Sequence, residues 1–154
     1  MKVVKFGGSS LASATQLGKV LNIVKSDSER KFVVVSAPGK REQSDTKVTD
    51  ALIKYYRAYV EEGDVTPHQE WIINRYAQMI EELELKPVVL EKITKSILNL
   101  ATLPIEDNLF LYDSFLAAGE NNNAKLVAAF FNKNGLNARY IHPKDCLLYT
   151  SPSP

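Results

Sequence analysis

Two short segments near the start of the chain carry residue types that could bind an anion. Residues 5–10 (KFGGSS) follow a short apolar run, and residues 36–39 (SAPG) follow a second one. Glycines let a ligand approach the backbone closely, and Lys5 adds a positive charge. Because the lysine precedes the glycines, the spacing matches neither a Walker A loop nor GxGxxG. Residues 5–10 therefore indicate a phosphate site or a tight turn with an incidental lysine, and residues 36–39 alone are better explained as a turn.

Two polar positions further along the chain also admit two interpretations each. Thr49 lies at the start of a predicted helix, where it could bind a carboxylate or cap the helix. Glu120 follows Gly119 in a polar stretch between two predicted helices, where it could hold an ammonium group of a ligand. An acidic side chain near a helix N-terminus is favourable in any case, so the local sequence leaves both alternatives open. Neither His68 nor His142 has a partner spaced for metal binding.

The elements that must position these residues begin with a strand, a helix and a strand. Residues 2–6 are β-branched and apolar around a lysine, and apolar residues recur every three or four positions over 11–24, with Ser9 or Ser10 as a cap. The continuous apolar run 32–35 is typical of a strand buried on both faces of a parallel sheet. In such a sheet, the carboxyl ends of neighbouring strands meet at one edge, where ligands bind. This βαβ unit therefore predicts that residues 5–10 and 36–39 lie together.

The rest of the chain is predicted to be mainly helical. Residues 39–47 are polar and indicate a mobile loop. Helices are expected over 48–60, 67–83, 87–100, 106–118 and 122–134, and a third strand over 137–142. Gly135 suits the position just after a helix end. Residues 146–154 end in two closely spaced prolines and are interpreted as a non-native tail, left by assembly or cloning.

The composition excludes several classes of partner. The sequence has 154 residues, enough for one domain with a core, and its net charge is +1. A chain this close to neutral has no broad field for nucleic acid or for an anionic membrane. No apolar stretch approaches the roughly 20 residues of a membrane span, and the N-terminus does not resemble a signal peptide. With one cysteine, Cys146, an internal disulfide is excluded, and a cytoplasmic location is expected.

Taken together, four segments in order resemble the start of the aspartate kinases, which are members of the amino acid kinase family. They are VVKFGGSSL at 3–11, VVVSAPGK at 33–40, TDALI at 49–53 and AAGENNNAKLVAAFF at 117–131. The resemblance covers about residues 1–145. It implies a three-layer αβα sandwich with a mainly parallel sheet. It also implies ATP-dependent phosphorylation of the β-carboxylate of L-aspartate to 4-phospho-L-aspartate, on the route to lysine, threonine and methionine.

The resemblance also assigns roles to individual residues. Positions that match the family's phosphate-contacting lysine and its backbone cradle are Lys5, Gly7, Gly8 and Ser9. Positions that match its substrate-binding residues are Ser36, Thr49 and Glu120. ATP and Mg²⁺ are the implied cofactors, and the family implies a homo-oligomer. Ser9 replaces the commoner threonine, and the sequence GENNN lacks the arginine that often follows the glutamate, which puts that contact in doubt.

The family's second lobe and its ACT regulatory domains have no counterpart in residues 1–145, which correspond to the amino-acid-binding part of the kinase domain. The chain is therefore expected to be an inactive fragment. Two other functions stay open at this point. One is a different amino acid kinase, acting for example on glutamate derivatives, although TDALI and GENNN argue against it. The other is a non-catalytic amino-acid-binding lobe.

Overall fold

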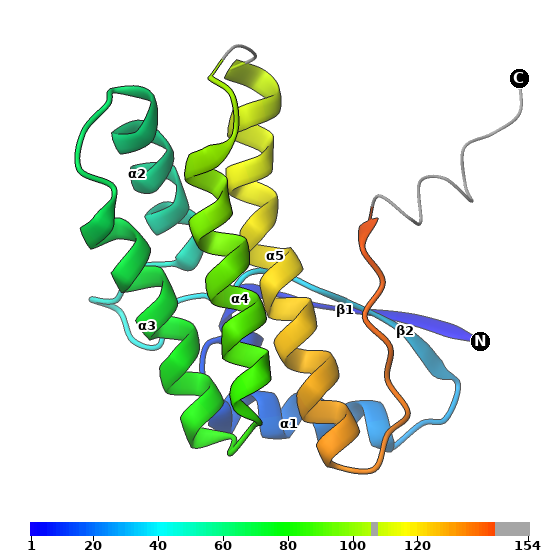
Figure 1. Ribbon diagram of the computed structural model, residues 1–154. Coiled ribbons are helices and arrows are strands. Elements are labelled where there is room, and N and C mark those ends of the chain that lie inside the picture. Colours follow the sequence, from blue (N-terminus) through cyan, green and yellow to red (C-terminus); the bar gives the residue numbers. More distant parts are fainter. Residues whose placement is uncertain (106–107, 144–154) are drawn as a thin grey trace, which may run out of the picture.

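A two-stranded parallel sheet lies beside a bundle of helices in the computed structural model (Figure 1). The structure describes residues 1–105 and 108–143. Strand β1 (Lys2–Phe6) pairs with β2 (Arg30–Val35), with Lys5 opposite Val34 and Phe6 opposite Val35. Helix α1 (Ala14–Lys25) joins the strands, so the predicted βαβ unit is confirmed.

The start of α1 differs from its prediction. Residues Gly8–Leu11 form a separate 3₁₀ helix, η1, immediately after β1. The residue that caps α1 is Ser13, whose Oγ accepts a hydrogen bond from the Gln16 backbone N–H at 3.3 Å. Ser9 and Ser10 therefore do not cap this helix, because both belong to the tight turn that precedes it.

One face of the sheet is exposed, so the prediction of a strand buried on both faces is wrong. Val3 is 67% exposed, Phe32 48% and Val34 47%, whereas Val35 is buried in the core. Successive side chains of a strand point to opposite faces. In the described part of the chain, the helices bury only one of the two faces.

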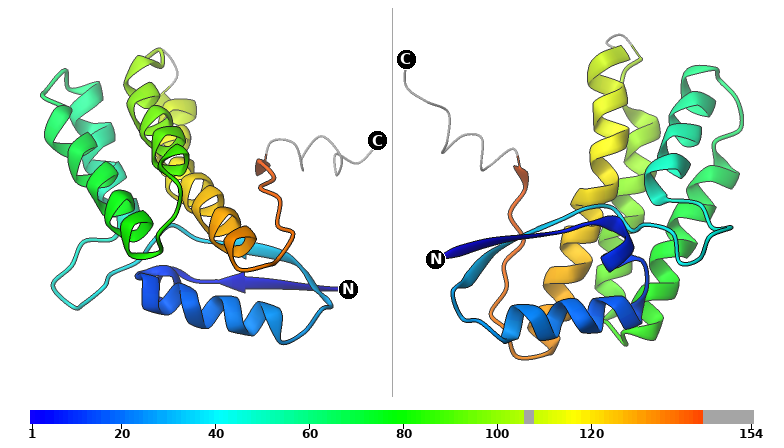
Figure 2. Two further views of the ribbon diagram at one scale, coloured as in Figure 1. Left: turned by 60° about the horizontal axis from the view of Figure 1, so that its bottom comes forward. Right: turned by 180° about the vertical axis from the view of Figure 1, so that it is seen from behind.

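Four helices form the bundle that packs beside the sheet (Figures 1 and 2). They are α2 (Val48–Val60), α3 (Thr66–Glu82), α4 (Pro87–Asn99) with a short 3₁₀ extension η2 (Leu100–Thr102), and α5 (Asn108–Lys133). The predicted helices over 48–60, 67–83 and 87–100 are thus confirmed to within about a residue at each end. Apolar residues at helical spacing bury one face of each helix, as the amphipathic pattern requires.

Aromatic side chains form the centre of the bundle. Tyr55, Tyr76 and Phe115 are fully buried, and the rings of Tyr55 and Phe115 meet edge to face with centroids 4.8 Å apart. Helix α5 extends from this cluster to the sheet, where its C-terminal half lies beside β2 (Figure 2). The bundle and the sheet therefore share one hydrophobic core.

Helix α5 is continuous from Asn108 to Lys133, so the predicted break around residues 119–123 is wrong. Gly119 is buried inside the helix, where a Cβ atom would lie 2.8 Å from the Ala37 Cβ. The side chains of Asn122 and Asn123 are fully buried and bond to other elements. Glycine and asparagine serve here for close packing and buried bonding rather than for a turn. Residues 106–107, where the predicted helix over 106–118 begins, lie outside the described residues.

The predicted strand over 137–142 does not form. The Ala138 N–H donates to Asn132 Oδ1 at 2.7 Å, and Asn132 Nδ2 donates to the Ala138 carbonyl at 2.9 Å. This exchange occupies the backbone N–H and carbonyl of Ala138, which a strand would use for pairing. Gly135 has a φ of 90° just beyond α5, as expected at a helix end. The interpretation of residues 146–154 as a tail lies outside the described residues.

Candidate active site

The two glycine-containing segments meet at the carboxyl edge of the sheet, as predicted. The Ser36 N–H donates to the Phe6 carbonyl at 3.2 Å, and the Gly39 N–H donates to the Gly8 carbonyl at 2.9 Å. A Cβ atom on Gly39 would lie only 2.6 Å from the carbonyl carbon of Gly8. The two backbones therefore approach so closely that residue 39 has to be glycine.

Helices α2 and α5 bring the remaining predicted residues to the same edge. The Val48 N–H donates to the Pro38 carbonyl at 3.2 Å, which fixes the start of α2, and hence Thr49, beside residues 36–39. Gly119 packs against Ala37, so its neighbour Glu120 lies at this edge as well. Backbone hydrogen bonds and the packing of Gly119 on Ala37 thus bring seven predicted residues to one end of the sheet: Lys5, Gly7, Gly8, Ser9, Ser36, Thr49 and Glu120.

Both charged residues of this group are available to a ligand. Lys5 and Glu120 are exposed, and neither forms a hydrogen bond or an ion pair with a described residue. Gly7 and Ser9 are exposed too, and a Cβ atom on Gly7 would meet nothing within 4 Å. The backbone at Gly7 therefore has open space beside it, near the Lys5 ammonium group, which has no bonded partner among the described residues.

The structural alternatives for Thr49 and Glu120 do not hold. Lys47 precedes α2 as its N-cap residue, and Thr49 belongs to the first turn of the helix rather than to its cap. Glu120 lies in the middle of α5 and not near a helix N-terminus. Helix capping and the helix dipole therefore explain neither residue.

Two buried polar residues contact the site, and sequence reasoning missed both. Arg75 on α3 donates from Nη2 to the Gly39 carbonyl at 3.2 Å and also to the Ala12 carbonyl. Asn123 on α5 donates from Nδ2 to the Ser36 carbonyl at 2.7 Å. Burial lowers the pKa of Arg75, and the positive charge of Arg41 lowers it further. The sequence did carry one sign of them: each polar residue interrupts the apolar face of its helix.

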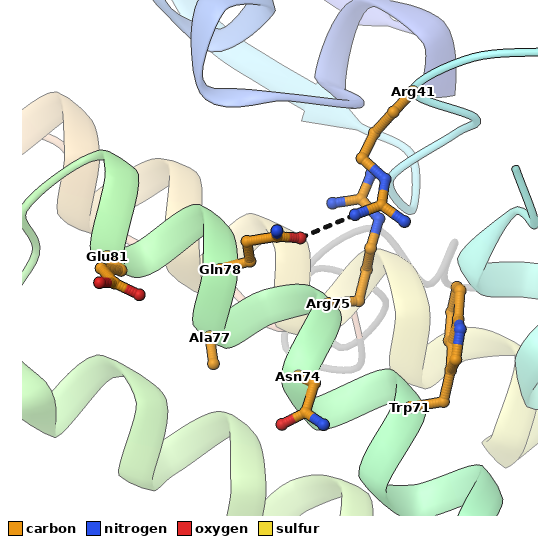
Figure 3. Close-up of a pocket in the computed structure, with 7 residues that line it drawn as sticks. All are labelled: Arg41, Trp71, Asn74, Arg75, Ala77, Gln78 and Glu81. Carbon is orange, nitrogen blue, oxygen red and sulfur yellow. Dashed lines mark hydrogen bonds between the residues drawn. The ribbon is translucent and has the colours of Figure 1, made fainter.

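A hollow of about 440 Å³ lies along α3 (Figure 3). Its lining residues are Arg41, Trp71, Asn74, Arg75, Ala77, Gln78 and Glu81. Arg41 closes one end by donating from Nη1 to Gln78 Oε1 at 2.7 Å. None of the predicted site residues lines this hollow, and the chemistry that the sequence indicates belongs to the sheet edge.

The described residues form neither a metal-binding cluster nor a membrane-spanning helix. They contain no group of three or more His, Cys, Asp or Glu side chains that could hold a metal ion. None of their helices combines the length and the apolar character needed to cross a membrane.

Comparison with curated proteins finds two aspartokinases. The chain is 47% identical to aspartokinase 3 of Bacillus subtilis over 154 residues, which is 100% of this chain and 34% of that protein. It is 30% identical to the chloroplastic aspartokinase 2 of Arabidopsis thaliana over 141 residues, covering 89% of this chain and 25% of that protein. The chain thus spans about a third or less of the length of these relatives.

Solved structures of aspartate kinases have the same fold. The Clostridium acetobutylicum aspartate kinase matches 84% of this chain and 29% of its own, with a TM-score of 0.70 and 34% identity. E. coli aspartokinase III, solved with lysine and aspartate, matches 87% of this chain and 29% of its own, with a TM-score of 0.70 and 23% identity. These matches confirm the predicted αβα class with a parallel sheet. A family model described as the amino acid kinase family matches residues 1–153, and the chain belongs to that family.

Proposed function

We propose that this chain supplies the amino-acid-binding part of an aspartate kinase. The reaction is transfer of the γ-phosphoryl group of ATP to the β-carboxylate of L-aspartate. The observation that carries the proposal is the meeting, at one edge of the sheet, of segments 5–10 and 36–39 with the residues that follow Val48 and Gly119. The similarity to two aspartokinases, over most or all of the chain, supports aspartate over other amino acids.

The nucleophile needs little activation. A free aspartate side chain has a pKa of about 3.9, so it is already ionised at neutral pH and requires no general base. The difficulty is the approach of this anion to a polyanionic phosphate chain. In this proposal, the exposed ammonium group of Lys5 offsets that repulsion and stabilises charge on the transferring group.

The backbone of Gly7, Gly8 and Ser9 would lie against the phosphates, and the open space beside Gly7 fits such a group. When bound, Mg²⁺ would neutralise phosphate charge. Since the described residues offer no cluster of metal ligands, phosphate oxygens rather than these side chains would hold it.

The substrate side of the site would use Ser36, Thr49 and Glu120. The Glu120 carboxylate, exposed and unpaired among the described residues, would balance the α-ammonium group of aspartate and thereby fix its orientation. The half-buried Ser36 and Thr49 would supply hydroxyl groups beside it. We further propose a cytoplasmic location and a homo-oligomer, with no nucleic acid or membrane partner.

The test compares Lys5→Ala and Glu120→Ala with Lys19→Ala in the whole protein that the gene encodes. Lys19 is an exposed lysine on α1 without a bonded partner among the described residues. We expect Lys5→Ala to lower kcat by about 10²- to 10³-fold, because it removes one charge that stabilises the transition state. We expect Glu120→Ala chiefly to raise the KM for aspartate, and Lys19→Ala to change neither constant.

Two results would contradict the proposal. One is full activity of both site variants, which would favour a non-catalytic lobe in which neither side chain matters. The other is a wild-type protein that phosphorylates glutamate derivatives in preference to aspartate. A panel of amino acid substrates, assayed with the wild-type protein and with both site variants, separates these outcomes.

A further inference from the structure

Very few polar side chains in the described part of the chain are fully buried, and two of them bond to the same short loop. Arg75 is 3% exposed, and Asn122 and Asn123 are both 0% exposed. Asn122 donates from Nδ2 to Ser96 Oγ at 3.1 Å, a contact between α5 and α4. Asn123 instead donates to the first carbonyl of residues 36–39, and Arg75 donates to the last.

Asn123 holds the beginning of this loop from α5. Its Nδ2 donates to the Ser36 carbonyl at 2.7 Å, while its Oδ1 is buried without a partner among the described residues. Rotating the amide by half a turn would place Oδ1 against the Ser36 carbonyl, and two acceptors would then face each other. The unsatisfied oxygen is therefore the cost of directing Nδ2 at Ser36.

Arg75 holds the end of the loop from α3. Its Nη2 bonds to the carbonyls of Gly39 and Ala12, so one guanidinium nitrogen joins the loop to the segment that follows η1. Its Nε is buried without a partner, and the side chain forms no ion pair with a described residue. A buried cation that lacks a carboxylate partner is a poor source of stability.

Both residues thus carry an unsatisfied buried group, and both direct their bonds at the loop that contains Ser36. The loop is also joined to Gly8 through the Gly39 N–H and to α2 through the Pro38 carbonyl. Both side chains are buried, so at the sheet edge they act on a ligand through the loop.

We propose that Arg75 and Asn123 are positioning residues that clamp residues 36–39 against the backbone of residues 7–10. The clamp fixes the spacing between the aspartate side of the site, represented by Ser36, and its phosphate side, represented by Gly7, Gly8 and Ser9. This inference rests on the proposed function, because it assigns these two sides. Misplacement of reacting groups by about 1 Å can cost about 10²-fold in rate, so a clamp of this kind would matter for turnover.

The activity test uses Asn123→Leu with Asn122→Leu as its matched control, in the whole encoded protein. The two asparagines are adjacent on α5 and equally buried, but only Asn123 bonds to the loop. We expect Asn123→Leu to lower kcat/KM for aspartate by about 10- to 100-fold, with a smaller change in the KM for ATP. Asn122→Leu should leave both constants within about twofold of wild type.

Arg75 is tested with Arg75→Met and Arg75→Lys, with Arg57→Met on the exposed surface of α2 as the control. Because Arg75 joins Gly39 to Ala12, which follows the 3₁₀ helix that contains Gly8 and Ser9, Arg75→Met should raise the KM for aspartate and for ATP together. A lysine keeps the charge and one bond, so Arg75→Lys should recover part of the loss. If Arg75→Met fails to fold, Arg75→Lys and Asn123→Leu still decide the question.

Amide hydrogen exchange provides a readout that does not depend on the reaction. Loss of the clamp should speed exchange of the Ser36 and Gly39 amides about 10-fold or more, while the amides at the centre of α3 keep wild-type rates. Unchanged exchange in both Asn123→Leu and Arg75→Lys, or equal activity of Asn123→Leu and Asn122→Leu, would overturn the proposal. A wild-type protein without aspartate kinase activity would refute the proposed function alone, because the exchange result would still decide whether the clamp exists.

Discussion

At the residue scale, an ion pair shapes the loop between β2 and α2. Asp45 Oδ2 accepts from Arg41 Nε at 2.6 Å and from the Arg41 backbone N–H at 2.9 Å, and Oδ1 accepts from Arg41 Nη2 at 2.9 Å. The polar sequence predicted a mobile loop here; the loop is confirmed and its mobility stays a prediction, while these bonds explain how the segment can hold a defined shape. Hydrogen bonds from the Arg41 side chain, chiefly, hold the pKa of Asp45 well below its usual range, although burial opposes this.

This pair should make stability depend on pH. Since the pKa of Asp45 is depressed in the folded state, its contribution is present above the unfolded value of about 3.9 and is lost as the pH falls through the lower folded value. We expect Asp45→Asn to cost up to about 1 kcal/mol at pH 7, because Arg41 is partly exposed and solvent screens the pair. Urea unfolding from pH 7 to pH 2 should show the wild type and the variant converging below about pH 4. Convergence at higher pH, or a constant gap, would contradict this assignment, and Glu70→Gln on the exposed face of α3 serves as the control.

At the scale of elements, the close contact between α5 and residues 36–39 depends on the absence of a side chain. A Cβ atom on Gly119 would lie 2.8 Å from the Ala37 Cβ and 3.0 Å from Leu52 Cδ1. Glycine within a helix costs roughly 1 kcal/mol relative to alanine, so propensity alone would favour the larger residue here. Packing outweighs propensity at this position.

Two glycine-to-alanine substitutions test which effect prevails. Gly119→Ala should destabilise the protein by about 1–3 kcal/mol through overpacking, even though it improves helix propensity. Gly18→Ala in α1 should stabilise it by about 0.5–1 kcal/mol, since a Cβ atom there meets nothing within 4 Å. Denaturant unfolding of both variants measures the difference in sign. Stabilisation by Gly119→Ala would show that α5 does not pack on the loop as described.

The elements also show how far the sequence alone could lead. Periodicity correctly predicted α2, α3 and α4, and the βαβ pattern correctly placed residues 5–10 beside residues 36–39. The predicted helix break at Gly119 was wrong. Glycine has a low helix propensity, but here it allows α5 to pack closely on Ala37, which is far away in the sequence. Arg75 and Asn123 were missed because their partners are backbone carbonyls far away in the chain, and only the folded structure reveals such partners.

At the scale of the whole molecule, the bundle and the sheet each contribute part of the candidate site. The bundle contributes the start of α2 and the middle of α5, and the sheet contributes the ends of β1 and β2 (Figure 1). Their shared core holds these four parts together, which is why residues from 5 to 120 reach a single edge. The same arrangement leaves the opposite sheet face, made of Val3, Phe32 and Val34, exposed among the described residues.

This exposed sheet face should make the 154-residue chain associate with itself. Apolar side chains on a sheet with open edges favour edge and face contacts between copies. We expect sedimentation to reveal concentration-dependent association, which the double variant Phe32→Thr and Val34→Thr reduces. Threonine keeps β-propensity, so the loss of apolar area is the main change.

The control is the double variant Val88→Thr and Leu98→Thr on α4, where Val88 is 45% exposed and Leu98 is 44% exposed. It removes a similar apolar area away from the sheet and should leave association unchanged. Equal reduction by both pairs would attribute association to general hydrophobicity, whereas a monomeric wild type at all concentrations would mean that this face is compatible with water.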